Sequence, residues 1–167
     1  MTRADPLPCL ASVAAAAARP DQPEAVFAAL REATGAAIGH VLFTVLLADP
    51  VRNESQRVYS SHPAEYPVGG RKPITDSEWF RIIRDRGEVW IGSTYEDVRW
   101  AFFDHELIRS LGCESAMNVP VRWNGRTWGT LNLLHRAGWY RPEDAATGKL
   151  FAAMATPALL ELAQRSP

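Results

Sequence analysis

Two apolar runs on either side of a turn signal are the clearest feature of this sequence. They cover residues 115–121 and 129–134, and an Asn-Gly pair occupies positions 124–125 between them. This pair tolerates the positive φ angles of a tight two-residue turn, so the pattern predicts a β-hairpin. Each run contains an asparagine, Asn118 or Asn132, where an aliphatic residue would suit a buried strand. Because an unpaired buried amide costs about 1–3 kcal/mol, we expect either the protein or a bound ligand to satisfy both side chains.

A hairpin with constant pairing determines which side chains share a face of the sheet. If the Asn-Gly pair forms the turn, Met117 lies opposite Asn132 and Asn118 lies opposite Leu131. Met117, Thr130 and Asn132 would then share one face, and Asn118 would lie on the other. One amide is therefore expected to face a cavity and the other the helix layer, unless both bond to nearby backbone groups.

The rest of the chain alternates between helical and extended periodicity. Helices are expected over residues 10–19, 22–34, 75–86, 105–111 and 142–164, the last one kinked at Pro157. Strands are expected over residues 40–48, 52–60 and 89–91 besides the hairpin. Residues 61–73 are expected to form a loop or a short hairpin across the sheet, and residues 93–104 a loop. Capping-box spacing at Asp21–Glu24 and at Thr75–Glu78 marks the start of two of the helices. This order predicts an α+β fold: one antiparallel sheet, with helices from both termini on one face and the middle elements on the other.

Length and composition indicate one globular domain. The chain has 167 residues, 47% of them hydrophobic, and a formal net charge of −1. We expect a single domain over residues 22–164, preceded by an Ala-rich helical extension over residues 1–21. The near-neutral charge argues against nucleic acid as a partner, and no run approaches the roughly 20 apolar residues of a membrane span. Cys9 and Cys113 lie far apart in the sequence, which suits a reducing cytoplasm better than a disulfide-bonded secreted protein.

Aromatic residues are concentrated in the segment that precedes the hairpin. Residues 90–103 contain Trp90, Tyr95, Trp100 and Phe103, interleaved with charged side chains. Aromatic walls with a few polar anchors are typical of small-molecule pockets, and ring faces also attract cationic amines. The same rings could instead pack as a lid that only extends the core. We expect at least one of them to contact a ligand.

No complete set of catalytic residues is visible in the sequence. Cys113 lies beside Glu114, which would raise the pKa of the thiol and disfavour a reactive thiolate. An acid–base role for Asp97, Asp104 or His105 is left open, because all three lie in or next to the aromatic segment. The histidines lack the spacing of metal ligands, so we expect no metal site, and no motif indicates a cofactor.

The order of several motifs resembles that of GAF domains, the sensor modules of phytochromes and cyclic-nucleotide phosphodiesterases. The motifs are Leu47-Ala48-Asp49-Pro50, Leu111-Gly112-x-x-Ser115, Asn118-Val119-Pro120-Val121 and Trp128-Gly129-Thr130-Leu131-Asn132-Leu133. The resemblance covers residues 22–164. It implies a six-stranded antiparallel sheet, a ligand cavity under short helices and loops on one face, and terminal helices on the other face that often form a dimer bundle. The Asn-Lys-x-x-x-Phe-x-x-x-Asp-Glu signature of cyclic-nucleotide binding is absent, and no cysteine lies where phytochromes attach bilins.

Together these observations predict a free-standing cytoplasmic sensor domain that binds a small polar or aromatic metabolite between the sheet and the 93–104 lid. The expected ligand contacts are Trp90, Tyr95, Trp100, Phe103, Met117, Thr130 and Asn132. The expected partners are a second copy of the chain, bound through the terminal helices, and a signalling protein. The alternative is an enzyme on the same fold, because free-methionine sulfoxide reductases are GAF-like enzymes. It would use thiol redox chemistry at Cys113, or acid–base chemistry at Asp97, Asp104 or His105.

Overall fold

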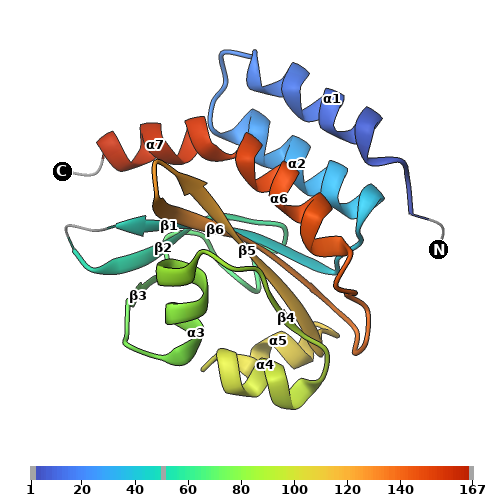
Figure 1. The fold of residues 1–167 in the computed structure, drawn as a ribbon, viewed down its shortest axis with the longest axis vertical. Coiled ribbons are helices and arrows are strands. Elements are labelled where there is room, and N and C mark those ends of the chain that lie inside the picture. Colours follow the sequence, from blue (N-terminus) through green and yellow to red (C-terminus); the bar gives the residue numbers. More distant parts are fainter. Residues whose placement is uncertain (1–2, 50–51, 166–167) are drawn as a thin grey trace.

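The centre of the structure is an antiparallel β-sheet. The computed structural model describes residues 3–49 and 52–165, and within these ranges the sheet has six strands in the order β3-β2-β1-β6-β5-β4 (Figure 1). The strands are β1 (Leu42–Asp49), β2 (Glu54–Ser60), β3 (Arg71–Pro73), β4 (Trp90–Gly92), β5 (Ser115–Trp123) and β6 (Arg126–His135). Pro50, which ends the first motif of the sequence analysis, lies outside the described residues.

Helices cover both faces of the sheet. On one face lie α2 (Glu24–Ala37), α6 (Asp144–Met154) and α7 (Thr156–Arg165), with α1 (Pro6–Ala17) packed outside them against α2 (Figure 1). On the other face lie α3 (Glu78–Phe80), which continues as a π-helical segment over Arg81–Arg86, and then α4 (Tyr95–Ala101) and α5 (His105–Ser110). This arrangement confirms the predicted α+β fold.

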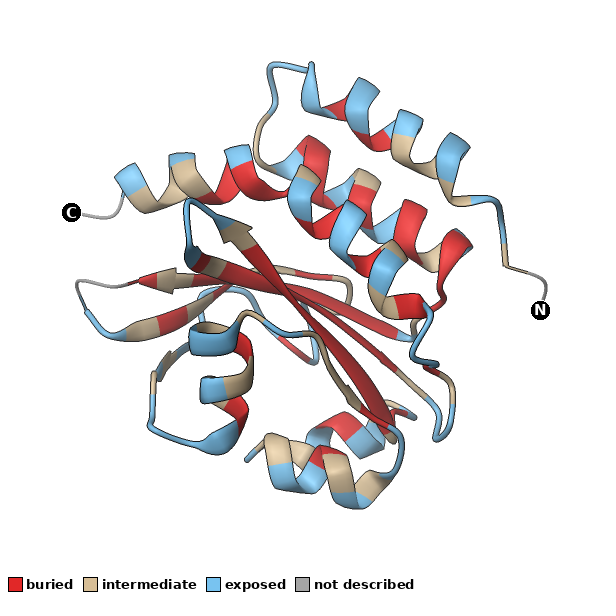
Figure 2. Cartoon of the chain, viewed as in Figure 1, coloured by how far each residue is buried: buried red, intermediate tan, exposed pale blue. Residues whose placement is uncertain are grey.

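The central strands are buried on both sides, as the colours of Figure 2 show. Successive side chains of a strand point to opposite faces, so Phe43 and Val45 of β1 join the core beneath the terminal helices. Leu42, on the opposite face, joins a second, smaller core that includes Ile108 of α5. The polar Thr44 lies on this second face, which is the face that carries the candidate site.

The hairpin turn forms where the sequence predicts it. Asn124 and Gly125 have φ angles of 49° and 73°, as a two-residue turn with two left-handed residues requires. Trp123 pairs with Arg126 directly beside the turn. The prediction of the turn is therefore confirmed.

The pairing of the two strands differs from the prediction by one residue. A bulge between Val121 and Arg122 shifts the register, so that Asn118 pairs with Asn132. The constant register that placed Met117 opposite Asn132 is wrong, because a bulge adds one residue to one strand only. Both amides consequently lie on the same face of the sheet, and Met117 lies on the face of the terminal helices.

The first two helices start at positions that the sequence analysis did not predict. α1 begins at residue 6 because the carboxylate of Asp5 accepts a hydrogen bond from the backbone N–H of Leu7 at 3.0 Å. The capping box expected at Asp21 does not form at α2. Instead, the side-chain oxygen of Gln22 accepts a bond from the N–H of Val26 at 3.3 Å.

The segment 93–104, expected as a loop, is largely helical. Thr94 and Asp97 form a reciprocal capping box at the start of α4, so the sequence contained a start signal that the aromatic content obscured.

The capping box expected at Thr75 and Glu78 does not form at the start of α3, where the N-cap is Ser77.

The C-terminal helix is divided in two. The sequence predicts one helix with a kink at Pro157, whereas α6 ends at Met154 and α7 begins at Thr156. Backbone N–H groups in the first turn of a helix have no acceptor within that helix, so a proline at such a position costs no hydrogen bond. The break before Pro157 thus removes the cost that a proline causes inside a helix.

Gly129 of β6 is expected to be intolerant of any side chain. An added Cβ would lie 2.0 Å from the carbonyl oxygen of Leu46 in the adjacent strand, and overpacking costs about 1–3 kcal/mol or more. We expect Gly129→Ala to lower the free energy of unfolding by at least about 2 kcal/mol, measured by urea denaturation. Gly35→Ala in α2 is the control: its nearest new contact is His40 Nε2 at 3.3 Å, and alanine favours the helix by about 1 kcal/mol. Equal losses at both positions would contradict the packing argument.

Candidate functional site

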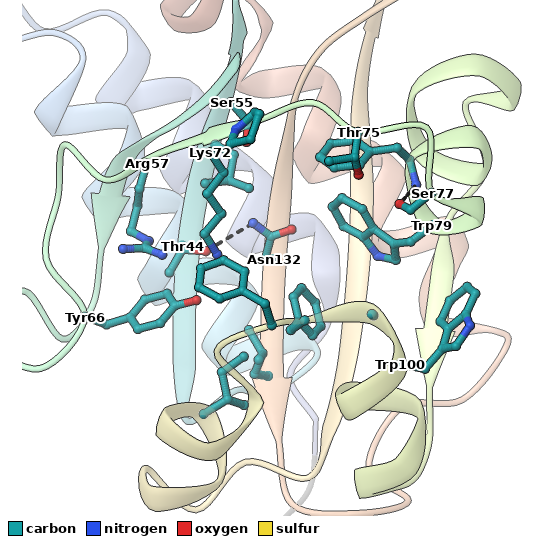
Figure 3. A pocket seen from close by; sticks show the side chains of 18 of the residues that line it. Thr44, Ser55, Arg57, Tyr66, Lys72, Thr75, Ser77, Trp79, Trp100 and Asn132 are labelled. Atoms are coloured by element: carbon teal, nitrogen blue, oxygen red, sulfur yellow. Dashed lines mark hydrogen bonds between the residues drawn. The ribbon is translucent and has the colours of Figure 1, made fainter. Parts of the chain in front are cut away.

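A cavity of about 510 Å³ lies on the sheet face opposite to α2, α6 and α7. Its floor comes from β1, β2 and β6, and its walls come from α3, β3 and the segment between α4 and α5 (Figure 3). The polar and charged side chains that line it are Thr44, Ser55, Arg57, Tyr66, Arg71, Lys72, Thr75, Ser77, Arg99 and Asn132. The aromatic rings that line it, besides that of Tyr66, are Trp79, Phe80, Trp100, Phe102 and Phe103.

A continuous chain of side-chain hydrogen bonds crosses the floor of the cavity. Trp79 Nε1 donates to Asn118 Oδ1 at 3.0 Å, and Asn118 Nδ2 donates to Asn132 Oδ1 at 2.7 Å. Asn132 Nδ2 then donates to Thr44 Oγ1 at 3.1 Å (Figure 3). The protein itself therefore gives both buried amides partners, through side chains rather than through backbone groups. We call these four residues the amide relay.

One end of the cavity holds a cluster of charged groups around Asp104. Asp104 Oδ2 accepts hydrogen bonds from the hydroxyl of Tyr66 at 2.6 Å and from Lys72 Nζ at 3.1 Å. The guanidinium of Arg57 stacks on the Tyr66 ring at 3.6 Å from its centroid and donates to the carbonyl of Pro67 at 2.7 Å. Burial raises the pKa of Tyr66, so its hydroxyl remains a donor. Burial also lowers the pKa of Lys72, and the charge of Asp104 opposes this effect.

Aromatic rings form the roof and the mouth of the cavity. Trp79 is buried and packs edge-on against Phe102 with 5.8 Å between ring centroids. Trp100 stacks on Trp90 at 6.0 Å but remains 55% exposed, and Phe103 is 77% exposed. Large exposed rings beside an apolar hollow mark a surface that a ligand or partner would cover.

Some of the ligand contacts expected from the sequence do lie at the cavity. Trp100, Phe103 and Asn132 line it directly. Thr130 lines a smaller hollow of about 30 Å³ that shares the walls Trp79 and Phe80 with the main cavity.

Trp90, Tyr95 and Met117 do not belong to the lining of the cavity. Trp90 lies behind Trp100, and the hydroxyl of Tyr95 lies 2.7 Å from Nδ1 of His105. Met117 packs beneath α6 in the core on the opposite face, as the shifted register requires.

The residues of the enzymatic alternative mostly have structural contacts. Cys113 is fully buried, and burial rather than its acidic neighbour raises the pKa of its thiol to about 11. Asp97 accepts hydrogen bonds at the start of α4, chiefly from Thr94, which lowers the pKa of its carboxyl. His105 bonds to Tyr95. Of the four residues, Asp104 alone has a side chain that hydrogen-bonds to residues lining the cavity, namely Tyr66 and Lys72.

The charged end of the site is not predicted from the sequence. Arg57 lies two residues after Ser55 on the inward face of β2, and a charged residue at a buried strand position is a signal that could have been used. Lys72 follows Gly69-Gly70, a pair that predicts only a turn, so the sequence does not indicate that this lysine belongs to a site. Tyr66 falls in the segment 61–73 and Trp79 in the helix predicted over residues 75–86, and neither position carries a signal of a binding site.

Comparison with known proteins agrees with the fold. The GAF domain family profile matches residues 24–159, and the chain belongs to this family. The GAF domain of a phosphoenolpyruvate-protein phosphotransferase from Coxiella burnetii superposes with a TM-score of 0.74 at 14% identity, covering 96% of this chain and 95% of that one. The corresponding domain from Acinetobacter gives 0.75 at 12% identity, covering 96% of both chains.

A third similar structure comes from a sensor protein. The GAF domain of a two-component sensor histidine kinase from Bacillus halodurans has a TM-score of 0.68 at 11% identity, covering 86% of this chain and 97% of that one. At such identities these likenesses show the fold alone. No curated protein matches the sequence.

Two features are absent from the part of the chain that the structure describes. None of its helices is both long enough and apolar enough to cross a lipid bilayer. Within residues 3–49 and 52–165, no group of three or more His, Cys, Asp or Glu side chains is placed to hold a metal ion.

The amide relay is expected to contribute to stability through its central member. Asn118→Ala leaves Trp79 Nε1 and Asn132 Oδ1 without partners, and each unpaired buried group costs about 1–3 kcal/mol. We expect the free energy of unfolding to fall by about 2–4 kcal/mol in urea titrations. Trp79→Phe removes only the indole donor from the relay, and the double variant should show a coupling energy of about 1 kcal/mol. Additive effects of the two substitutions would show that this hydrogen bond contributes little.

The two cysteines are expected to react at very different rates. Cys9 is partly exposed, whereas Cys113 is buried with a raised pKa, and only thiolates are good nucleophiles. Iodoacetamide at pH 8.5 should modify one thiol per native chain rapidly and the second only after unfolding. Mass spectrometry of the labelled protein measures both reactions. Cys9→Ser should abolish the rapid reaction. Rapid labelling of Cys113 in that variant would restore the thiol alternative.

Proposed function

We propose that this chain is a sensory GAF domain that binds a small organic molecule between the sheet and its aromatic roof. GAF domains are in general small-molecule-binding sensory modules. The observation that carries the proposal is the cavity itself, whose volume of about 510 Å³ falls in the range of roughly 300–1,000 Å³ that is usual for ligand sites. Its aromatic rings and its polar and charged side chains also fit such a site, the rings as walls and the polar groups as anchors.

The exposed rings at the mouth support the same proposal. Trp100 and Phe103 together present apolar surface to solvent beside an open hollow, and covering such surface is worth about 25 cal/mol per Å². A ligand seated beneath them would remove this surface from water. It would also order the segment between α4 and α5, and a shift of this kind needs only a difference in affinity between two conformations.

The proposal includes a signalling partner because several similar structures come from signalling proteins. These include a sensor histidine kinase domain from Bacillus halodurans, a methyl-accepting chemotaxis protein and the chromophore-binding domain of a Stigmatella aurantiaca bacteriophytochrome. By analogy, this chain would act in the cytoplasm, pair with a second copy through its terminal helices and report ligand binding to a signalling protein. The exposed Leu7 on α1 and Leu150 on α6 are consistent with a helical interface.

A metabolite screen tests the proposal. We expect at least one compound to raise the Tm by several degrees, because a ligand that binds only the folded state stabilises it. Native mass spectrometry of the purified chain should detect the same class of molecule.

Trp100→Ala should reduce the shift at least several-fold, since it removes a wall of the cavity. Trp123→Ala is the matched control, because this tryptophan is 57% exposed at the hairpin turn and does not line the cavity. The proposal fails if no compound stabilises the protein and no small molecule co-purifies, or if both variants respond alike.

A further inference from the structure

All the charged side chains that line the cavity have the same sign. Across the described ranges they are Arg57, Arg71, Lys72 and Arg99, and no acidic side chain contributes to the lining. The two arginines nearer the rim, Arg71 and Arg99, each have a glutamate partner, at 3.5 Å and 3.6 Å respectively. The cations that matter for a ligand are therefore the inner pair.

This inner pair, Arg57 and Lys72, shares one carboxylate. Asp104 Oδ2 lies 3.1 Å from Lys72 Nζ and 4.0 Å from the nearer guanidinium nitrogen of Arg57. The three side chains are only 7% (Arg57), 26% (Lys72) and 13% (Asp104) exposed. Two positive charges and one negative charge leave one positive charge unbalanced in a largely buried place, where charges need partners.

The hydrogen bonds of the cluster are also incomplete. Arg57 Nε and Asp104 Oδ1 are buried and have no hydrogen-bond partner among the described residues. A buried polar group without a partner costs about 1–3 kcal/mol. Arg57 Nε thus lacks an acceptor, which a second carboxylate would supply together with the missing negative charge. Asp104 Oδ1 lacks a donor, and an ionised carboxylate does not supply one.

We propose that the cavity takes a small organic monocarboxylate with an apolar or aromatic body, its carboxylate held by Arg57 and Lys72. The inference rests on the proposed function and names its ligand class. One unbalanced positive charge matches a monoanion better than a phosphate dianion, and a cationic amine would add a third positive charge. The rings of Trp79 and Phe102, which also line the cavity, provide the contacts for the apolar body.

Asp104 is expected to weaken the binding of a ligand carboxylate, because it already interacts with Lys72. Its carboxylate accepts a hydrogen bond from Lys72 Nζ, which also lies 4.2 Å from the ring centroid of Phe103, the residue before Asp104. A ligand carboxylate would compete with that of Asp104 for the same ammonium group. Neutralising Asp104 should therefore strengthen the binding of acids, whereas neutralising Lys72 should weaken it.

Isothermal titration of the full chain with three matched probes tests the proposal. The probes are 2-naphthylacetate, 2-naphthylacetamide and 2-(2-naphthyl)ethylamine, which share one ring system and differ in charge. We expect the acid to bind at least tenfold more tightly than the amide, and the amine to bind more weakly still. Naphthyl phosphate should bind no better than the acid, and tighter binding would overturn the assignment to a carboxylate.

Variants separate a ligand contact from a structural role. Lys72→Met should reduce the preference for the acid over the amide to less than about threefold, and Lys72→Arg should restore it. Lys149→Met is the control, because it removes the other lysine of the chain, which lies exposed on α6 across the sheet. Asp104→Asn should tighten the binding of the acid several-fold and leave that of the amide unchanged. Loss of acid binding in Asp104→Asn would overturn the competition.

The failure of this inference is distinguishable from the failure of the proposed function. If the amide or the amine binds as tightly as the acid, or if Lys72→Met leaves the preference intact, the carboxylate assignment is wrong although the cavity binds ligands. If no naphthyl probe binds, the compound found in the metabolite screen decides: a carboxylate sustains the inference, and a neutral or cationic compound overturns it. Binding of no compound at all removes the proposed function, and the inference with it.

Discussion

The need of two buried amides for hydrogen-bond partners organises one whole side of this protein. Asn118 and Asn132 lie side by side on neighbouring strands, so each amide satisfies part of the other. Their remaining hydrogen bonds join Asn118 to Trp79 of α3 and Asn132 to Thr44 of β1. These bonds connect helix α3 to a central strand through side chains alone. Helix α3 and its π-helical continuation are too short to be stable by themselves. Their position over the sheet therefore depends on contacts such as this one, and so does the wall of the cavity.

The two ends of the cavity differ in how well their polar groups are satisfied. Along the amide relay each amide has partners, and this region forms a neutral floor. Around Asp104, by contrast, donors and acceptors are left over and the charges do not balance. Well-satisfied polar networks stabilise a fold, whereas incompletely satisfied ones mark places where another group is expected. This contrast separates the part of the site that maintains the structure from the part that is available for recognition.

The sequence predicted the architecture well and the charged end of the site poorly. Strand and helix order follow from periodicity, and the Asn124-Gly125 turn follows from the positive φ angles that both residues adopt. The bulge after Val121 left no mark in the pattern of apolar residues, so the register of the hairpin was predicted one residue out. Local signals determine elements, whereas the exact pairing depends on packing across the whole sheet.

The residues of the charged cluster could not be grouped from the sequence for a related reason. Arg57, Tyr66, Lys72 and Asp104 come from a strand, a loop, an edge strand and a helix junction. They meet only because β3 pairs with β2 and the α4–α5 segment folds back across the sheet. Trp100 and Phe103 could be predicted because aromatic residues are concentrated in their segment, and Asn132 because an asparagine stands out in an apolar run.

Strand β6 contributes side chains to both faces of the sheet, and this has a mechanical consequence for how the two faces are linked. Asn132 belongs to the floor of the cavity, while its neighbours Leu131 and Leu133 belong to the core beneath the terminal helices. Because consecutive side chains point to opposite sides of the same main chain, a displacement of β6 at Asn132 moves both leucines with it. The shortest connection between the two faces of the protein is therefore one peptide unit long, and no sequence of intermediate side chains is required to link them.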